Sequence, residues 1–185
     1  MKSKNFVINL LIVIFVSGFV SCDSEPPVFE KGTLIGNYTG SCTVSLGVKS
    51  EKVLNFPAEF KQKDRNSLYF SMGDITTYES IGLSTLKVAT EFKEYKGYAG
   101  FNLENINDSF GKDQIPDFIK MNVSLTWEIR NMLLKLYVDS KNPPKYLIAS
   151  KKLTVTYRGV IEMTGKSSDE KYSTPVTYVF DLNKR

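Results

Sequence analysis

The sequence contains no histidine, two cysteines and one tryptophan among its 185 residues. Without histidine, the chain lacks Ser-His-Asp and Cys-His catalysis, the commonest zinc ligand, and a side chain that titrates near neutral pH. Two cysteines exclude a disulfide framework. The chain also contains no phosphate-binding loop, dinucleotide fingerprint, metal-ligand spacing or nucleophile elbow. We therefore expect a protein that is not an enzyme and that uses no cofactor or metal.

The composition is that of an ordinary globular domain, with 42% hydrophobic and 24% charged residues. Its length favours one domain. The formal net charge is +4, and two of the lysines, Lys2 and Lys4, lie in a leader segment. The other basic residues are scattered along the chain, usually beside acidic or polar residues, which is typical of a solvated surface. We therefore expect no nucleic-acid partner.

The N-terminal segment is typical of a secretory signal peptide. Lys2 and Lys4 precede an almost wholly apolar run, 6–16, and small residues follow it. Counted to Val20, the apolar stretch is shorter than the roughly 17–25 residues that cross a bilayer comfortably, which disfavours a permanent transmembrane helix. The sequence therefore predicts a signal peptide at 1–21.

Phe19-Val20-Ser21-Cys22 resembles a bacterial lipobox. The resemblance implies that Cys22 is diacylated and becomes the mature N-terminus, with Phe19 standing where the family usually has Leu, Val or Ile. Two acyl chains would anchor the protein stably to the membrane. The alternative is an ordinary cleaved signal peptide, with Cys22 either unmodified or in a disulfide with Cys42.

A polar, proline-containing segment follows Cys22, and we interpret 22–31 as a tether. Its acidic residues Asp23 and Glu25 resemble the surface-export signal of certain Gram-negative lipoproteins. The resemblance implies a lipid-anchored protein of the outer membrane, with surface exposure favoured over the periplasmic face.

From residue 32 to 185 the dominant hydrophobic period is two, which predicts a single domain built from β-strands. In the first strand, Leu34, Tyr38, Cys42 and the other apolar residues share one parity, together with glycines at 36 and 40. Glycine on the apolar face permits a bend or a close backbone approach. Such a strand is what a barrel or a strongly coiled sheet requires.

Alternation continues along the chain and predicts about eight strands with one or two short helical turns. Pro57 makes the strand at Leu54–Phe60 an edge or bulged strand. The segment 73–94 fits neither period, and we expect a loop with a helical turn near Thr77–Gly82. Further strands are expected at 68–72, 95–103, 123–129, 134–138, 153–163 and 176–182, with loops at 105–112 and 165–174.

The opening Leu34-Ile35-Gly36-Asn37-Tyr38-Thr39-Gly40, soon after the candidate lipidated cysteine, resembles the calycin-like lipoproteins of Gram-negative bacteria. The resemblance is architectural across the mature chain. It implies a mainly β, antiparallel calycin-like barrel or strongly coiled sheet. The family has no assigned activity, so the resemblance implies a fold and a location but no site.

Acidic residues offer few candidates for chemistry. Glu128 and Glu162 could act as a glycosidase pair if the fold brought them together. Each lies among the polar residues of an alternating strand, however, which favours the solvated outer face of the sheet. Asp108, Asp113 and Asp117 lack the glycine and terminal glutamate of an EF-hand loop. We expect Cys42 to be a buried thiol.

The aromatic residues Tyr95, Tyr98 and Phe101 are the candidate ligand-binding residues. They lie beside Gly97 and Gly100 in one expected strand, in which residues 95 and 101 would point to one face and residue 98 to the other. Exposed aromatic rings near glycines suit stacking on sugars or on flat apolar ligands, whereas most other aromatic residues of a sheet pack in its core.

Two functions follow as hypotheses. In the first, the barrel binds a small apolar molecule or a glycan at its open end. In the second, the protein is an accessory subunit that docks on another envelope protein by strand addition. An apolar lumen would favour the first function. A lumen filled by side chains, with an exposed edge at Leu54–Phe60 or an apolar surface patch, would favour the second.

Overall fold

The computed structural model describes residues 30–185. The expected signal peptide at 1–21, the lipidation of Cys22 and most of the tether at 22–31 lie outside the described residues and stay predictions. Lys31, the last expected tether residue, begins a short 3₁₀ helix, η1 (Lys31–Leu34). Among the described residues, every helix is too short or too polar to cross a membrane.

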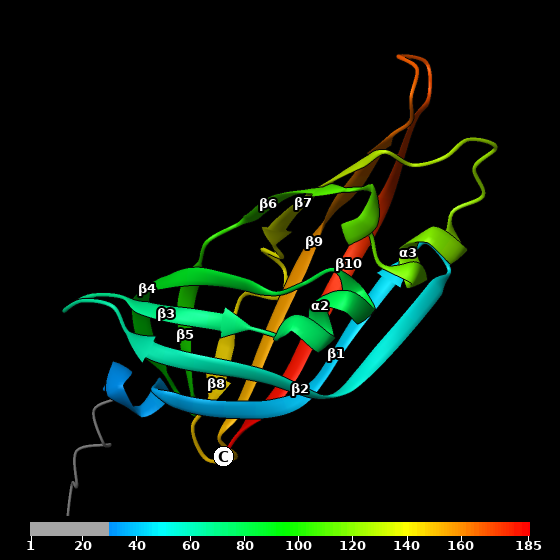
Figure 1. The fold of residues 1–185 in the computed structure, drawn as a ribbon. Coiled ribbons are helices and arrows are strands. Elements are labelled where there is room, and N and C mark those ends of the chain that lie inside the picture. Colours follow the sequence, from blue (N-terminus) through cyan, green and yellow to red (C-terminus); the bar gives the residue numbers. More distant parts are fainter. Residues whose placement is uncertain (1–29) are drawn as a thin grey trace, which may run out of the picture.

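Ten antiparallel strands form one sheet, in the order β10-β1-β2-β3-β4-β5-β8-β9-β7-β6. The strands are β1 (Gly36–Leu46), β2 (Lys49–Gln62), β3 (Leu68–Met72), β4 (Thr85–Tyr95), β5 (Tyr98–Leu103), β6 (Ile106–Gly111), β7 (Asn131–Val138), β8 (Lys145–Leu147), β9 (Lys152–Thr164) and β10 (Lys171–Lys184). Because β9 pairs with β8 on one side and β10 on the other, the sheet closes into a ring (Figure 1). The prediction of a mainly β, barrel-like sheet is confirmed.

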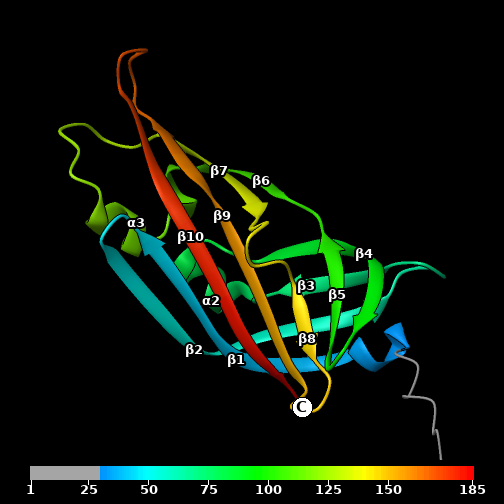
Figure 2. The same ribbon diagram turned by 180° about the vertical axis from the view of Figure 1, so that it is seen from behind.

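The two ends of the barrel differ. At the end where the described chain begins, η1, the C-terminus and the turns β4–β5 and β8–β9 lie together; we call this the tether end (Figure 2). At the opposite end, β9 leaves β8 and pairs with β7, which in turn pairs with β6. Three short helices lie on this side of the molecule: α2 (Ile75–Ile81), η2 (Lys112–Gln114) and α3 (Asp117–Asn122). Of these, α2 packs against β2 and α3.

The interior of the barrel is filled by side chains. The largest fully buried ones are aromatic and come from β1, β2, β3, β9 and β10: Tyr38, Phe56, Phe60, Phe70, Tyr157, Tyr178 and Phe180. Phe60 stacks on Phe70 with ring centroids 4.5 Å apart and meets Tyr38 edge-on at 5.7 Å. Close packing of this kind leaves the interior as a core rather than a lumen.

The first strand bends where the glycine pattern predicts. A Cβ at Gly40 would overlap the carbonyl oxygen of Asp181 and lie 2.8 Å from the Cα of Leu182. The register of β1 against β2 shifts beside Gly40, and Asn55 on β2 has a φ of 57°. The expected bulge near Pro57 is therefore confirmed. Only part of β2 is an edge, because β3 pairs with its residues 58–62.

The ambiguous segment 73–94 contains a helix and a strand. The expected helical turn is confirmed as α2, which is capped by Asp74 and ends at Gly82 with a φ of 72°. The strand β4 follows, and its register against β5 shifts between Thr90 and Lys93. Glu91 has a φ of 54° at this bulge. The extra residue changes the side-chain parity, which explains why no single period fits the segment.

Three predicted elements are wrong. The expected strand at 123–129 is an irregular segment with bends at Val123, Thr126 and Trp127, and it has no strand partner among the described residues. The expected loop at 105–112 contains β6, because Ile106 and Phe110 face the core while the residues between them are polar. The expected strand at 95–103 is interrupted by a turn at Lys96 and Gly97, where the φ of 86° at Gly97 permits the reversal.

Candidate functional site

An open pocket of about 390 Å³ lies on the outer side of strands β4, β5 and β8. Along β5, Ala99 and Phe101 are buried in the core, so that Tyr98 and Gly100 face outward. Along β8, Tyr146 is buried and its neighbours face outward. The pocket is therefore outside the barrel, and its second wall is the loop 141–144.

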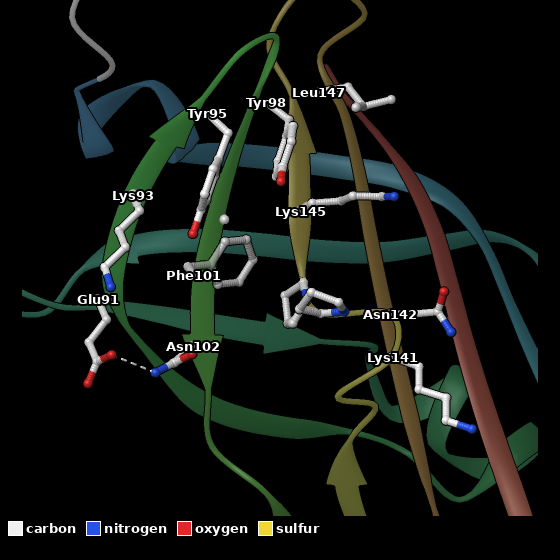
Figure 3. A pocket seen from close by; sticks show the side chains of 13 residues that line it. Glu91, Lys93, Tyr95, Tyr98, Phe101, Asn102, Lys141, Asn142, Lys145 and Leu147 are labelled. Atoms are coloured by element: carbon white, nitrogen blue, oxygen red, sulfur yellow. Dashed lines mark hydrogen bonds between the residues drawn. The ribbon is translucent and has the colours of Figure 1, made fainter.

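Tyr95 and Tyr98 form an aromatic platform in this pocket. Their rings stack with centroids 4.8 Å apart and an interplanar angle of 12°, and Tyr95 is 47% exposed. Figure 3 shows the two rings side by side, one from β4 and one from β5. Gly100 makes room for this arrangement, because a Cβ there would lie 3.1 Å from the Tyr95 ring. The missing side chain at Gly100 thus leaves room for the Tyr95 ring next to β5.

Phe101 has a different role from the two tyrosines. It contributes to the pocket wall, but its side chain is only 4% exposed and packs against Phe60 and Phe92. The expectation that all three rings are exposed is therefore wrong for Phe101. Alternation along β5 explains the difference, because residues 98 and 101 lie on opposite faces of the strand. Phe101 can support the site but cannot stack on a ligand.

Charged and polar side chains surround the platform. Lys93, Lys141 and Lys145 line the pocket, and none of them forms an ion pair with an acidic residue in the described part of the chain. The carboxylate of Glu91 accepts a hydrogen bond of 2.8 Å from Asn102 Nδ2 (Figure 3). Sequence reasoning missed these residues, since only the pairing of β8 with β5 brings residues 141–145 beside residues 91–102.

Asp139 holds the second wall of the pocket in place. Its carboxylate accepts hydrogen bonds from the backbone of Lys141 (3.0 Å), from Asn142 Nδ2 (2.9 Å) and from Arg158 Nε (2.7 Å). These donors, with the Arg158 bond the largest cause, lower the pKa of Asp139 to about 2. Asp139 N also donates to Thr156 O at 2.9 Å, which fastens the loop to β9. The wall is therefore preorganised before any ligand binds.

The other candidate residues are used within the fold. Cys42 is fully buried and burial raises its pKa, which confirms the expected buried thiol. Glu128 pairs with Lys112 and Arg130, whereas Glu162 pairs with Lys135 at 2.9 Å. Within residues 30–185 no cluster of three potential metal ligands forms, so Asp108, Asp113 and Asp117 do not come together as a metal site.

A second pocket, of about 330 Å³, lies beside the segment 123–129. Val123, Leu125, Trp127 and Ile129 line it and are partly buried, whereas the residues between them are exposed. The segment thus keeps the side-chain alternation of a strand. Among the described residues, its backbone forms no backbone–backbone hydrogen bond until Arg130 N donates to Thr164 O.

Comparisons with protein-family models, curated proteins and solved structures gave no match. The resemblance to the calycin-like lipoproteins therefore stays a prediction. The chemistry of the pocket is the remaining basis for a functional inference.

Proposed function

We propose that this protein is a lipid-anchored, non-enzymatic component of the outer membrane of a Gram-negative bacterium, exposed at the cell surface. Its barrel binds a glycan in the pocket beside Tyr95 and Tyr98. The observation that carries the proposal is the stacked tyrosine pair, with Tyr95 exposed and Tyr98 half-buried, in an open pocket whose walls mix polar and apolar side chains. The anchor and the location follow from the leader segment and Cys22, which lie outside the described residues.

A sugar ring matches this pocket well. One face of a pyranose ring presents C–H groups that pack on an aromatic ring, and its edges present hydroxyl groups. The stacked tyrosines offer the aromatic surface. Asn102, Glu91 and the three lysines offer hydrogen-bond donors and acceptors around it. The pocket is open along one side, which suits a chain of sugars better than a single enclosed molecule.

A small apolar ligand inside the barrel has less support. Sites for such molecules are concave, mostly apolar and able to bury most of the ligand. The inward-facing side chains of this barrel are packed against one another, as Phe60 and Phe70 illustrate. The outer pocket is open rather than enclosed, and its lining mixes the apolar side chains of Pro143, Pro144 and Leu147 with three lysines.

The experiment is a glycan array probed with the segment Asp23–Arg185, which keeps every described strand and core residue and lacks Cys22. The double variant Tyr95→Ala, Tyr98→Ala should weaken binding by about tenfold or more, because it removes the stacking surface. Tyr137→Ala is the matched control, since Tyr137 is also exposed, at 56%, and lies on β7 away from the pocket. Failure to bind any glycan, or equal loss in the control, would contradict the proposal.

The alternative is an accessory subunit that docks on another envelope protein. The segment 123–129 favours it, because its backbone has no strand partner among the described residues and its side chains alternate as in a strand, so that a partner strand could pair with it. A photo-crosslinking side chain at Thr126 in the living cell tests it. One specific cross-linked envelope protein would support docking, and cross-linking no stronger than at an exposed control position such as Ser173 would count against it.

A further inference from the structure

The loops at the tether end form one continuous surface. Four hydrogen bonds join them: Lys31 Nζ to Asp64 O (3.2 Å), Lys184 Nζ to Thr33 O (2.6 Å), Lys184 N to Lys151 O (3.0 Å) and Ile148 N to Gly97 O (3.2 Å). These bonds connect η1, the β2–β3 loop, the C-terminus and the turns β8–β9 and β4–β5. Two of these bonds join backbone to backbone and two join a lysine side chain to the backbone, so the loops form one connected surface rather than independent segments.

This surface is basic. It carries Lys63, Arg65, Lys96, Lys151, Lys184 and Arg185, which we call the basic end. None of the six forms an ion pair with an acidic residue within the described part of the chain. Glu30, Asp64 and Glu94 are the acidic residues of the same loops and strand ends.

Two local contacts involve the charged groups of the basic end. The carboxylate of Asp64 accepts hydrogen bonds from the backbone N–H groups of Asn66 (2.8 Å) and Ser67 (2.9 Å). These hydrogen bonds lie within the β2–β3 loop, which contains Asp64 itself. The charges of Lys184 and Lys151 lie close together. Partial burial and then the charge of Lys151 lower the pKa of Lys184. An anion at this position would relieve the repulsion between the two ammonium groups.

The opposite end of the molecule has a different charge arrangement. Lys112 and Arg130 pair with Glu128, and Lys120 pairs with Asp117. The β9–β10 turn contains Asp169 and Glu170 between Lys166 and Lys171. Positive and negative charges are thus interspersed there, which makes the charge distribution of the barrel asymmetric along its axis.

We propose that the basic end rests on a lipid bilayer that contains anionic headgroups. The described chain begins at this end, at Glu30, and residues 22–30 can extend over at most about 30 Å. A lipid anchor at Cys22, on which the orientation in the cell depends as part of the proposed function, would therefore keep the basic end near the bilayer. Clusters of exposed basic residues are attracted to anionic lipid surfaces, each adding to the affinity.

The test measures vesicle binding of the segment Asp23–Arg185, which has no lipidated cysteine and so isolates the contribution of the barrel. The vesicles are phosphatidylcholine alone, or phosphatidylcholine with about 30% phosphatidylglycerol, an anionic lipid. We expect co-sedimentation with the anionic vesicles only, and its loss in high salt because exposed charges are screened. Equal binding to both kinds of vesicle would overturn the proposal, as would no binding to either at low salt.

Two charge-matched variants locate the contact. Replacing Arg65, Lys96, Lys151 and Arg185 by Gln should weaken binding by at least about tenfold. Replacing Lys49, Lys120, Lys166 and Lys171 by Gln removes the same charge from the opposite end and should change binding less than about twofold. Equal effects of the two variants would contradict a contact through the basic end. Because the vesicles contain no glycan, this outcome is independent of glycan binding at Tyr95 and Tyr98.

Discussion

At the scale of single residues, three buried tyrosines tie the core to the segments that connect the strands. Tyr38 donates to Leu34 O at 2.6 Å, Tyr157 to Glu104 O at 2.8 Å and Tyr178 to Ile81 O at 2.7 Å. Each ring fills the barrel while its hydroxyl satisfies a backbone carbonyl. These tyrosines are therefore structural, in contrast to the exposed Tyr95 and Tyr98.

Tyr178→Phe should destabilise the fold by about 1–3 kcal/mol, because it leaves the carbonyl of Ile81 without this donor inside the core. Urea unfolding of the variant and of the wild type measures the difference. Tyr137→Phe, at an exposed position, should change the free energy of unfolding by less than about 0.5 kcal/mol. Equal stability of Tyr178→Phe and the wild type would show that the buried hydrogen bond contributes nothing.

Asp139 predicts an acid-dependent loss of stability. Its pKa in the folded protein is lowered from its usual 3.8 to about 2, so the folded state favours the ionised carboxylate. The stabilisation is present above about pH 4 and is lost as the pH falls towards 2. Thermal melting between these pH values should show a smaller decrease in Tm for Asp139→Asn than for the wild type. An identical pH dependence of the two proteins would contradict this assignment.

The sequence predicted only some of the residues of the pocket correctly. The glycines beside Tyr95 and Tyr98 pointed to the exposed platform, and Gly100 does lie beneath the Tyr95 ring. The burial of Phe101 was missed, because the turn at Gly97 separates Tyr95 from β5, and along β5 Phe101 faces the core while Tyr98 faces outward. The lysines of the pocket could not be assigned, since they meet only through the pairing of β8 with β5.

At the scale of elements, the closure of the sheet depends on close backbone approaches. Gly40 on β1 lies against Asp181 and Leu182 of β10, and Gly159 on β9 lies against Lys135 and Leu136 of β7. Each glycine lies on the apolar face of an alternating strand, so the sequence indicated the first bend correctly. The local alternation of apolar and polar residues did not indicate which strand each glycine lies against.

Gly40→Ala should destabilise the barrel by about 1–3 kcal/mol or more, because the new methyl group overlaps the backbone of β10. Gly32→Ala is the control, since a Cβ at Gly32 meets no atom within 4 Å. Chemical denaturation compares the two variants with the wild type. A Gly40→Ala protein as stable as Gly32→Ala would mean that β1 and β10 can move apart without cost.

The same scale explains the wrong strand prediction at 123–129. The alternation of Val123, Leu125, Trp127 and Ile129 is real, and these side chains are partly buried against the core. Strand formation also needs a partner backbone. The pairing of β7 with β9 ends at Asn131 and Thr164, where β9 itself ends, so the residues before Asn131 have no paired strand beside them in the described part of the chain. Periodicity reports which side of an extended segment is buried but not whether the segment is paired.

At the scale of the whole molecule, the barrel places its two candidate binding surfaces on the outside. The tyrosine platform flanks the β4–β5 turn, and Lys96 of that turn belongs to the basic end. A glycan in the pocket would therefore be bound beside the surface that we propose rests on the bilayer. The sequence predicted the barrel-like fold but could not distinguish a filled interior from an empty one, because both need the same inward-facing apolar pattern.

The charge of the pocket predicts a preference among glycans. Lys93, Lys141 and Lys145 line the pocket without an acidic partner among the described residues, so a sugar with carboxylate, sulfate or phosphate groups should bind more tightly than its neutral counterpart. Isothermal titration at low and high salt measures the difference. The triple change of these lysines to Gln should remove the preference and leave the weaker neutral binding. Tighter binding of the neutral sugar to the wild type would contradict the expectation.

The location of the bound glycan is the most direct test. Backbone amide shifts of isotope-labelled Asp23–Arg185 can be followed by nuclear magnetic resonance while the best oligosaccharide from the array is added. We expect the shifts to concentrate in residues 91–102 and 141–147, around the tyrosine platform. Shifts concentrated instead at inward-facing positions such as Phe70 or Tyr178, or scattered without relation to the pocket, would contradict glycan binding on the outer side of the barrel.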